Sequence, residues 1–155
     1  MTTTLHATTT AHTTSRTRAP LGRLLAVSAG ATVVAGAATE AWVALARVAG
    51  VHVAVGDFFG DPSVAPQAIP AGSYAFSIAL CMVVGTAIAA LLNWRARRPA
   101  RTYVAVAGVL TFVSLGAPLV SAGASAGTKV TLIVAHLIAA AVIVPLVARC
   151  LAKRG

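Results

Sequence analysis

Four long apolar stretches constrain the fold of this chain more than any other feature. Each is about 20 residues long, the length at which an α-helix crosses the hydrocarbon core of a bilayer. They cover residues 21–47, 73–94, 102–122 and 130–151. The composition agrees, since 58% of the residues are hydrophobic and 10% are charged, whereas a soluble domain carries about 25% charged residues. The sequence therefore predicts an all-α, polytopic membrane protein, built as a four-transmembrane-helix bundle.

The segments outside the bundle have a different composition. Residues 1–20, MTTTLHATTTAHTTSRTRAP, are rich in Thr and poor in large apolar side chains, so we predict a disordered tail before a transmembrane domain over residues 21–155. Residues 48–72 form the one long connection, which repeated Gly and Pro residues interrupt. We predict that this outer loop is irregular and lies outside the hydrocarbon or against the bundle.

Positive charges predict the orientation, because Lys and Arg near the ends of spans stay on the cytoplasmic side. Three basic clusters fall on one side of the bundle: Arg16, Arg18 and Arg23; Arg95, Arg97, Arg98 and Arg101; Arg149, Lys153 and Arg154. The opposite side receives Arg47 and Lys129. We therefore predict a multi-pass protein of the cytoplasmic (inner) membrane of a bacterium, with both termini cytoplasmic (N-in/C-in).

The first span also has features of a cleaved secretory signal. It follows a basic stretch and contains the small residues AGA at positions 35–37, which is typical of such signals. The apolar run, however, continues through AWVALA, well beyond the roughly 7–15 residues of a signal core. We therefore expect the first span to be retained.

Several function classes are not indicated. The net charge of +9 comes from short clusters between apolar runs, whereas a nucleic-acid-binding domain places its cations along one polar face. Cys81 and Cys150 lie in different spans without CxxC spacing, so we expect neither a disulfide framework nor a zinc site. Asp57 and Asp61 lie in a turn-rich loop and are interpreted as solvated turn formers. No metal and no cofactor is predicted.

Small residues recur at every fourth position of the first two spans. The first carries Ser28, Thr32, Gly36 and Glu40, and the second carries Ser77, Cys81, Gly85, Ala89 and Asn93. Residues four apart share one helix face, and small residues let membrane helices approach closely. We therefore predict a helix-packing seam that comprises Ser28, Thr32, Gly36, Gly85 and Ala89.

Glu40 is the one carboxylate within the spans. At a rise of about 1.5 Å per residue it lies about 8 Å outward of the bilayer centre, and His136, on an antiparallel span, lies about 6 Å outward. A charge in hydrocarbon costs at least about 2.5 kcal/mol, so Glu40 is expected to face inward and pair. His136 matches its depth, and Arg47 lies two turns away. We predict an intramembrane polar site of Glu40, His136, Ser114, Cys81 and Ser77.

Two interpretations of this site stay open. An ionisable pair inside a membrane is the usual basis of proton relays and substrate binding. Alternatively, Glu40 belongs to a static pair that fixes packing, or is hydrated near the outer surface. The shallow depth favours this second interpretation, because ionisable groups are cheaper to keep near the interface than at the centre.

Two resemblances bear on function. The segments GDFFGDPSVAPQAIPAG and VAHLIAAAVIVPLVARCL, in a four-span, Ala- and Arg-rich chain, resemble the small four-helix membrane proteins of unknown function common in actinobacteria. This resemblance implies a cytoplasmic-membrane location and no known chemistry. The chain also resembles the small multidrug-resistance exporters, in which Glu40 would match the membrane glutamate of the first span. It departs from them in its long first loop, the outer position of Glu40 and its strong cation bias.

These observations predict an integral membrane protein that is a structural or interaction subunit of the cytoplasmic membrane. The alternative is a small proton-coupled transporter that uses a buried Glu40/His136 pair. An enzyme is not predicted, because HExxH and CxxC motifs are missing from the sequence and the polar residues are too few for a nucleophile, a base and an oxyanion stabiliser. The expected partners are the lipid bilayer and either a membrane protein or a second copy of this chain.

Overall fold

The computed structural model describes residues 18–57, 61 and 63–152. The elements in this part of the chain are α1 (Leu21–Val48), β1 (Ala54–Val55), β2 (Gln67–Ala68), α2 (Ser73–Arg95), α3 (Pro99–Ser114), α4 (Gly116–Val120) and α5 (Ala126–Ala152). Most of the predicted disordered tail, residues 1–17, lies outside the described residues. Disorder there stays a prediction.

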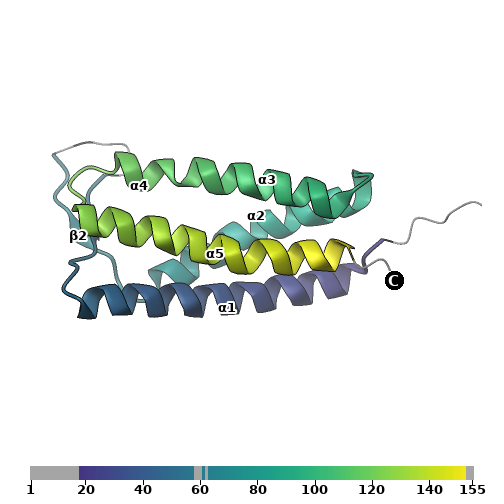
Figure 1. Cartoon of the computed structure of the whole chain (residues 1–155), viewed down its shortest axis with the longest axis horizontal. Helices are drawn as coiled ribbons and strands as arrows, with labels where there is room; N and C mark the ends of the chain where they lie inside the picture. The colour runs from purple at the N-terminus through teal and green to yellow at the C-terminus, as the bar shows by residue number, and fades with distance from the viewer. Residues whose placement is uncertain (1–17, 58–60, 62, 153–155) are drawn as a thin grey trace, which may run out of the picture.

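Four helical segments of the described chain are long and apolar enough to cross a bilayer. They are α1, α2, α5 and the segment Pro99–Val120, which contains α3 and α4. All four run along the long axis of the molecule, side by side (Figure 1). The predicted all-α, four-helix membrane bundle is therefore confirmed, and the orientation of its termini stays a prediction.

The helices pack as a ring in which α1 contacts α2 and α5. The helix α3 packs against α5 and less extensively against α2. On the α1–α5 side, Trp42 donates its indole N–H to the Thr131 carbonyl at 3.1 Å. Near the beginning of α1, the Asn93 side chain accepts from the Ala19 N–H at 3.2 Å and donates to the Ala19 carbonyl at 2.9 Å. These bonds fix the register of antiparallel neighbours.

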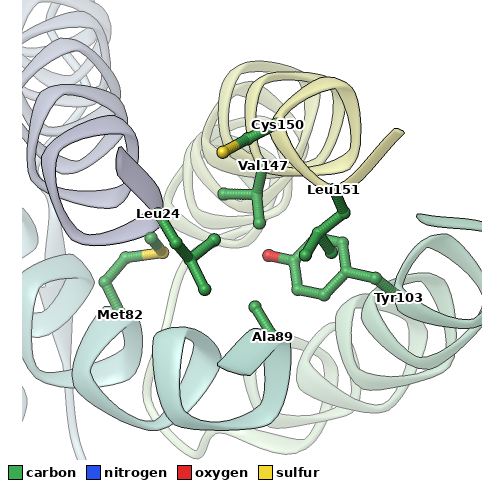
Figure 2. Close-up of a cluster of buried hydrophobic side chains, with 7 residues drawn as sticks. All are labelled: Leu24, Met82, Ala89, Tyr103, Val147, Cys150 and Leu151. Carbon is green, nitrogen blue, oxygen red and sulfur yellow. The ribbon is translucent and has the colours of Figure 1, made fainter. Parts of the chain in front are cut away.

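A cluster of buried side chains joins the helices at the end where α1 begins (Figure 2). Its members are Leu24, Met82, Ala89, Tyr103, Val147, Cys150 and Leu151. Leu24 and Tyr103 point toward each other across the centre, with Val147 on one side and Ala89 on the other (Figure 2). Many other large apolar side chains point outward, among them Phe76 and Phe112, which are 72% and 78% exposed. Such surfaces suit lipid, which rewards no further burial of apolar groups.

A proline within a span is expected to kink or end its helix, and the third span, which contains Pro118, is interrupted. The helix α3 ends at Ser114, Leu115 forms a turn, and α4 resumes at Gly116. A proline ring clashes with the carbonyl four residues earlier, here that of Ser114, and supplies no N–H to bond it. The interruption therefore falls at the position where the proline removes one backbone hydrogen bond of the helix.

The long outer loop is more regular than predicted. Its two short strands pair antiparallel, with Ala54 opposite Ala68 and Val55 opposite Gln67. The prediction of an irregular loop is wrong at this point, because the two arms of the loop satisfy each other's backbone groups and sequence periodicity cannot reveal strands of two residues. Phe58, Phe59 and Gly60 lie outside the described residues.

Hydrogen bonds attach the hairpin to the end of the bundle where α4 ends and α5 begins. Gly56 N–H donates to the Ala122 carbonyl at 3.2 Å, and the Thr128 hydroxyl donates to the His52 carbonyl at 2.9 Å. Close backbone approach requires glycine here, since a Cβ on Gly56 would lie 2.8 Å from the Ala122 oxygen. The two hydrogen bonds tie the loop to the turn between α4 and α5 and to the first turn of α5.

Gly123→Ala tests this attachment. Gly123 has φ +69°, and an added Cβ would lie 2.6 Å from Pro66 Cγ in the loop. We expect the free energy of unfolding to fall by more than the roughly 1–2 kcal/mol that a left-handed conformation costs a residue with a Cβ. Thermal unfolding in detergent micelles measures the change.

Gly50→Ala is the matched control, because Gly50 has φ +87° but no atom within 4 Å of the added Cβ. Gly50→Ala should therefore show the conformational cost alone. Equal losses of stability in the two variants would contradict the close contact between Gly123 and Pro66.

Candidate functional site

Glu40 projects from α1 onto the beginning of α2. Its Oε1 accepts hydrogen bonds from the backbone N–H groups of Tyr74 at 3.0 Å and Ala75 at 3.1 Å. These are the second and third residues of α2, whose first turn has unpaired N–H groups like that of any helix. A carboxylate at this position also interacts favourably with the positive end of the helix dipole. Glu40 is thus an N-terminal cap of α2 supplied by a different helix.

The local sequence of α2 explains why a cap from outside is needed. Residue Gly72 precedes the helix with φ 86°, makes no side-chain cap, and no acidic residue lies in the first turn. In water such N–H groups would be solvated, but near hydrocarbon they require a partner within the protein. The carboxylate and the N–H groups of the helix terminus therefore supply each other with hydrogen-bond partners, which offsets the cost of removing both from water.

The predicted pairing of Glu40 with His136 is not what the structure shows. His136 Nδ1 bonds the Leu132 carbonyl of its own helix at 2.8 Å, and the bonds of Glu40 go to α2. Among the described residues no hydrogen bond or ion pair joins the two side chains. Depth along the membrane was the basis of the prediction, and depth alone does not fix which helix faces which.

Arg47, which lies two turns from Glu40, bonds the outer loop. Its Nη2 donates to the Ile69 carbonyl at 2.6 Å. Ile69 N–H in turn donates to the Val53 carbonyl at 3.1 Å, next to the β-hairpin. Arg47 therefore ties the end of α1 to the chain segment that leads into α2, two turns beyond the contact that Glu40 makes.

The predicted helix-packing seam is closest at Gly36. A Cβ added there would lie 3.3 Å from Ala75 Cβ, the residue whose N–H binds Glu40. Toward the beginning of α1 the two helices are farther apart, and Ser28 and Thr32 line a space of about 440 Å³ between them. Ala89 is fully buried, whereas the nearest atom to a Cβ on Gly85 belongs to Met82, one turn earlier.

The other predicted site residues gather around one cavity of about 480 Å³. Four of them line it: Ser77 and Cys81 from α2, Ser114 from α3, and His136 from α5. Glu40 does not contribute to the lining. The structure thus brings together the polar residues of three helices and separates them from the carboxylate.

Two further cavity residues were missed by sequence reasoning. Thr39 of α1 and Tyr74 of α2 also line the cavity, and their hydroxyl oxygens are buried without a hydrogen-bond partner among the described residues. Thr39 is the immediate neighbour of Glu40, and Tyr74 donates its backbone N–H to Glu40. The signal available in the sequence was spacing, because Thr39 lies three residues after Gly36 and Tyr74 lies three residues before Ser77, and residues three apart share one helix face.

The acidic residues of the outer loop hold a turn. Asp61 Oδ1 accepts from the Ser63 hydroxyl at 2.7 Å and from the Ser63 N–H at 2.8 Å. These two bonds, the hydroxyl first, lower the pKa of Asp61 below its usual value. Their contribution to loop stability is therefore present above about pH 4 and lost as the pH falls through the lowered pKa. Within the described residues, no group of three or more His, Cys, Asp or Glu side chains is placed to hold a metal ion.

Residues 123–127 read GASAG, so the sequence does contain the G-x-S-x-G pattern found around some nucleophilic serines. A nucleophilic serine in this pattern needs a sharp strand-to-helix turn, whereas Ser125 lies between the helices α4 and α5. Its Oγ accepts from the Thr128 N–H at 3.1 Å. A serine that bonds the third N–H of a helix is an N-cap, so the pattern marks the beginning of α5.

Comparison with known proteins gives one result. The model of a family described as "Family of unknown function (DUF6069)" matches residues 19–153. This range starts at Ala19, which Asn93 binds, and includes every helix of the structure. The match therefore covers the whole bundle with its loop. No curated protein matches the chain, and no solved structure matches it.

Substitution of Glu40 measures the strength of the cap. Glu40→Ala leaves two N–H groups of α2 unpaired in a partly buried position, and hydrogen bonds to a charged group contribute about 1.5–3 kcal/mol. Glu40→Gln keeps an acceptor oxygen and should lose less. Thermal unfolding in detergent, read by circular dichroism, should rank wild type above Gln and Gln above Ala. If Glu40→Ala were as stable as wild type, the capping role would be wrong.

Proposed function

The chain belongs to the DUF6069 family, whose function is unknown, and from its own residues we propose that it is a structural or interaction subunit of a bacterial cytoplasmic membrane. The observation that carries this proposal is the position of Glu40. A carboxylate that carries protons or cations has to gain and release its ligand in each cycle. Glu40 is the only carboxylate in the spans, and its bonds hold two helices together.

The outer surface supports an interaction role. Large apolar side chains are exposed on both α2 and α3, including Phe76, Val83, Phe112 and Val113. Lipid accepts such a surface, and so does the apolar face of another membrane helix. The face of α3 opposite the cavity is therefore the surface on which we expect a membrane-protein partner or a second copy of this chain.

The distribution of cations supports an orientation with both termini in the cytoplasm. Arg18 lies over the ring of Trp94, with its guanidinium carbon 5.9 Å from the ring centroid, at the end of the bundle that also carries Arg95, Arg97 and Arg98. Basic and aromatic side chains combine in this way at the cytoplasmic interface. The β-hairpin then lies on the outer side.

Cysteine labelling in cells tests the orientation. In a background with Cys81→Ser and Cys150→Ala, a membrane-impermeant maleimide added outside should modify Ser63→Cys, because Ser63 is exposed in the outer loop. Ala152→Cys, exposed at the end of α5, is the matched control and should react only after the membrane is permeabilised. Reaction of Ala152→Cys in intact cells, with Ser63→Cys protected, would reverse the topology.

Photo-crosslinking tests the interaction role. A benzophenone amino acid at Phe112, which is 78% exposed, should form a protein adduct in cells. The same amino acid at Ala107, which lines the cavity on the same helix, should not. The proposal would be overturned by adducts with lipid alone, together with a proton flux into vesicles of the purified protein that Glu40→Gln abolishes. That second result would favour the proton-coupled transporter.

A further inference from the structure

The cavity between α2, α3 and α5 is elongated along the membrane normal. On α2 its lining runs from Tyr74 to Ile88, and on α3 from Ser114 to Tyr103. At 1.5 Å per residue these segments are about 21 Å and 16 Å long. The volume of about 480 Å³ lies in the range of small-molecule sites, roughly 300–1,000 Å³. Such a volume over such a length fits a slender molecule rather than a compact one.

The polar groups of the cavity are concentrated at its outer end. Tyr74 and Ser77 belong to the first two turns of α2, and Ser114 is the last residue of α3. Thr39 and His136 lie at the corresponding level of α1 and α5, since nearby Trp42 bonds Thr131 across the two helices. Farther in, the lining is mostly apolar, with Ile88, Ala107, Ile143 and Val144, and Tyr103 adds one hydroxyl at the inner end. The cavity is thus amphipathic along its length.

Three groups at the outer end have unused hydrogen-bonding capacity. Thr39 is 1% exposed, and its hydroxyl and that of Tyr74 have no partner among the described residues. The Leu132 carbonyl can only accept, so His136 Nδ1 carries the hydrogen of their bond, and a neutral ring then presents Nε2 as an acceptor. A ligand head group that both donates and accepts satisfies all three.

The surroundings select an uncharged head group. No Asp, Glu, Lys or Arg side chain lines the cavity, so a charged group would be desolvated without a counter-ion. The charges of Arg47 and Glu40 both act on Tyr74 at the outer end, and because they are opposite they offset each other there. A hydroxyl or an ester carbonyl avoids the desolvation cost that a charged head group would incur.

The bilayer itself gives access to the cavity. Ser77 and Cys81 line the cavity and are also exposed on the surface of the protein. They lie on α2 on the side of α3, where the two helices pack less extensively than α1 with α5. A molecule dissolved in the membrane can therefore enter sideways with its chain already parallel to the helices.

We propose that this cavity binds an uncharged single-chain amphiphile, a long-chain alcohol or a monoacylglycerol, with its head group among Thr39, Tyr74 and His136 and its chain directed toward Ile143. The binding is independent of the partner surface on α3. Glu40 bonds the backbone of Tyr74, and within the described residues no hydrogen bond joins its carboxylate to the side chains of Thr39, Tyr74 or His136.

Photo-labelling tests this proposal with the full chain in phospholipid nanodiscs. The probe is a monoacylglycerol with a diazirine near the end of its chain, and the adducts are mapped by mass spectrometry. We expect labelling near Ile143 and Ile88, which excess unlabelled long-chain alcohol suppresses. Thr39→Val and Tyr74→Phe each remove one hydroxyl and should lower labelling about 2- to 10-fold, the change that corresponds to one hydrogen bond.

A pair of neighbouring alanines provides the matched control. Ala140 lines the cavity, whereas Ala141 is exposed and does not. Ala140→Phe should block labelling, and Ala141→Phe should leave it unchanged. If Ala140→Phe were labelled as strongly as the wild type, or if the adducts mapped to lipid-facing residues such as Phe112, the probe would be reacting from the bilayer and not from the cavity. Either result would overturn the proposal. Stronger labelling by the corresponding fatty-acid probe would overturn the uncharged head group.

Discussion

In hydrocarbon a backbone N–H has no water to bond, and the structure of this protein depends on how that requirement is met at the start of α2. The helix begins after a glycine that supplies no cap, and Glu40 of α1 fills the role with one carboxylate oxygen on two N–H groups. A charge that would be costly alone becomes favourable, because the helix terminus offers both donors and a positive dipole end.

The same contact organises what lies around it. Gly36, one turn before Glu40, allows α1 to approach Ala75 closely, and Arg47, two turns after it, holds the loop that leads into α2. Tyr74 donates its backbone N–H to Glu40 and also lines the cavity. The cap therefore positions one wall of the cavity, although Glu40 itself does not line it. For this reason the carboxylate and the cavity can lie at the same depth along the bundle and still be separate.

Much of the fold could be predicted, and part of the candidate site. Span length and hydropathy gave the four helices, and Pro118 gave the interruption of the third, because both depend on local chemistry. Counting residues from the membrane centre grouped Ser77, Cys81, Ser114 and His136, and the structure places these four around one cavity. The partner of Glu40 was predicted wrongly, since residues at equal depth can face different neighbours. Thr39 was overlooked because a lone threonine carries no signal of its own.

By itself the amino-acid sequence determined that this chain enters a membrane, how many times it can cross, and that a carboxylate must face inward. These three conclusions follow from the free-energy cost of placing unpaired backbone groups and charges in hydrocarbon. That cost depends on each segment separately, so it can be judged from the sequence of the segment. Only the tertiary structure decided that the carboxylate caps a helix and that unpartnered hydroxyls surround a cavity. Those outcomes depend on the rotation and order of the helices, which small-residue packing sets between segments far apart in the chain.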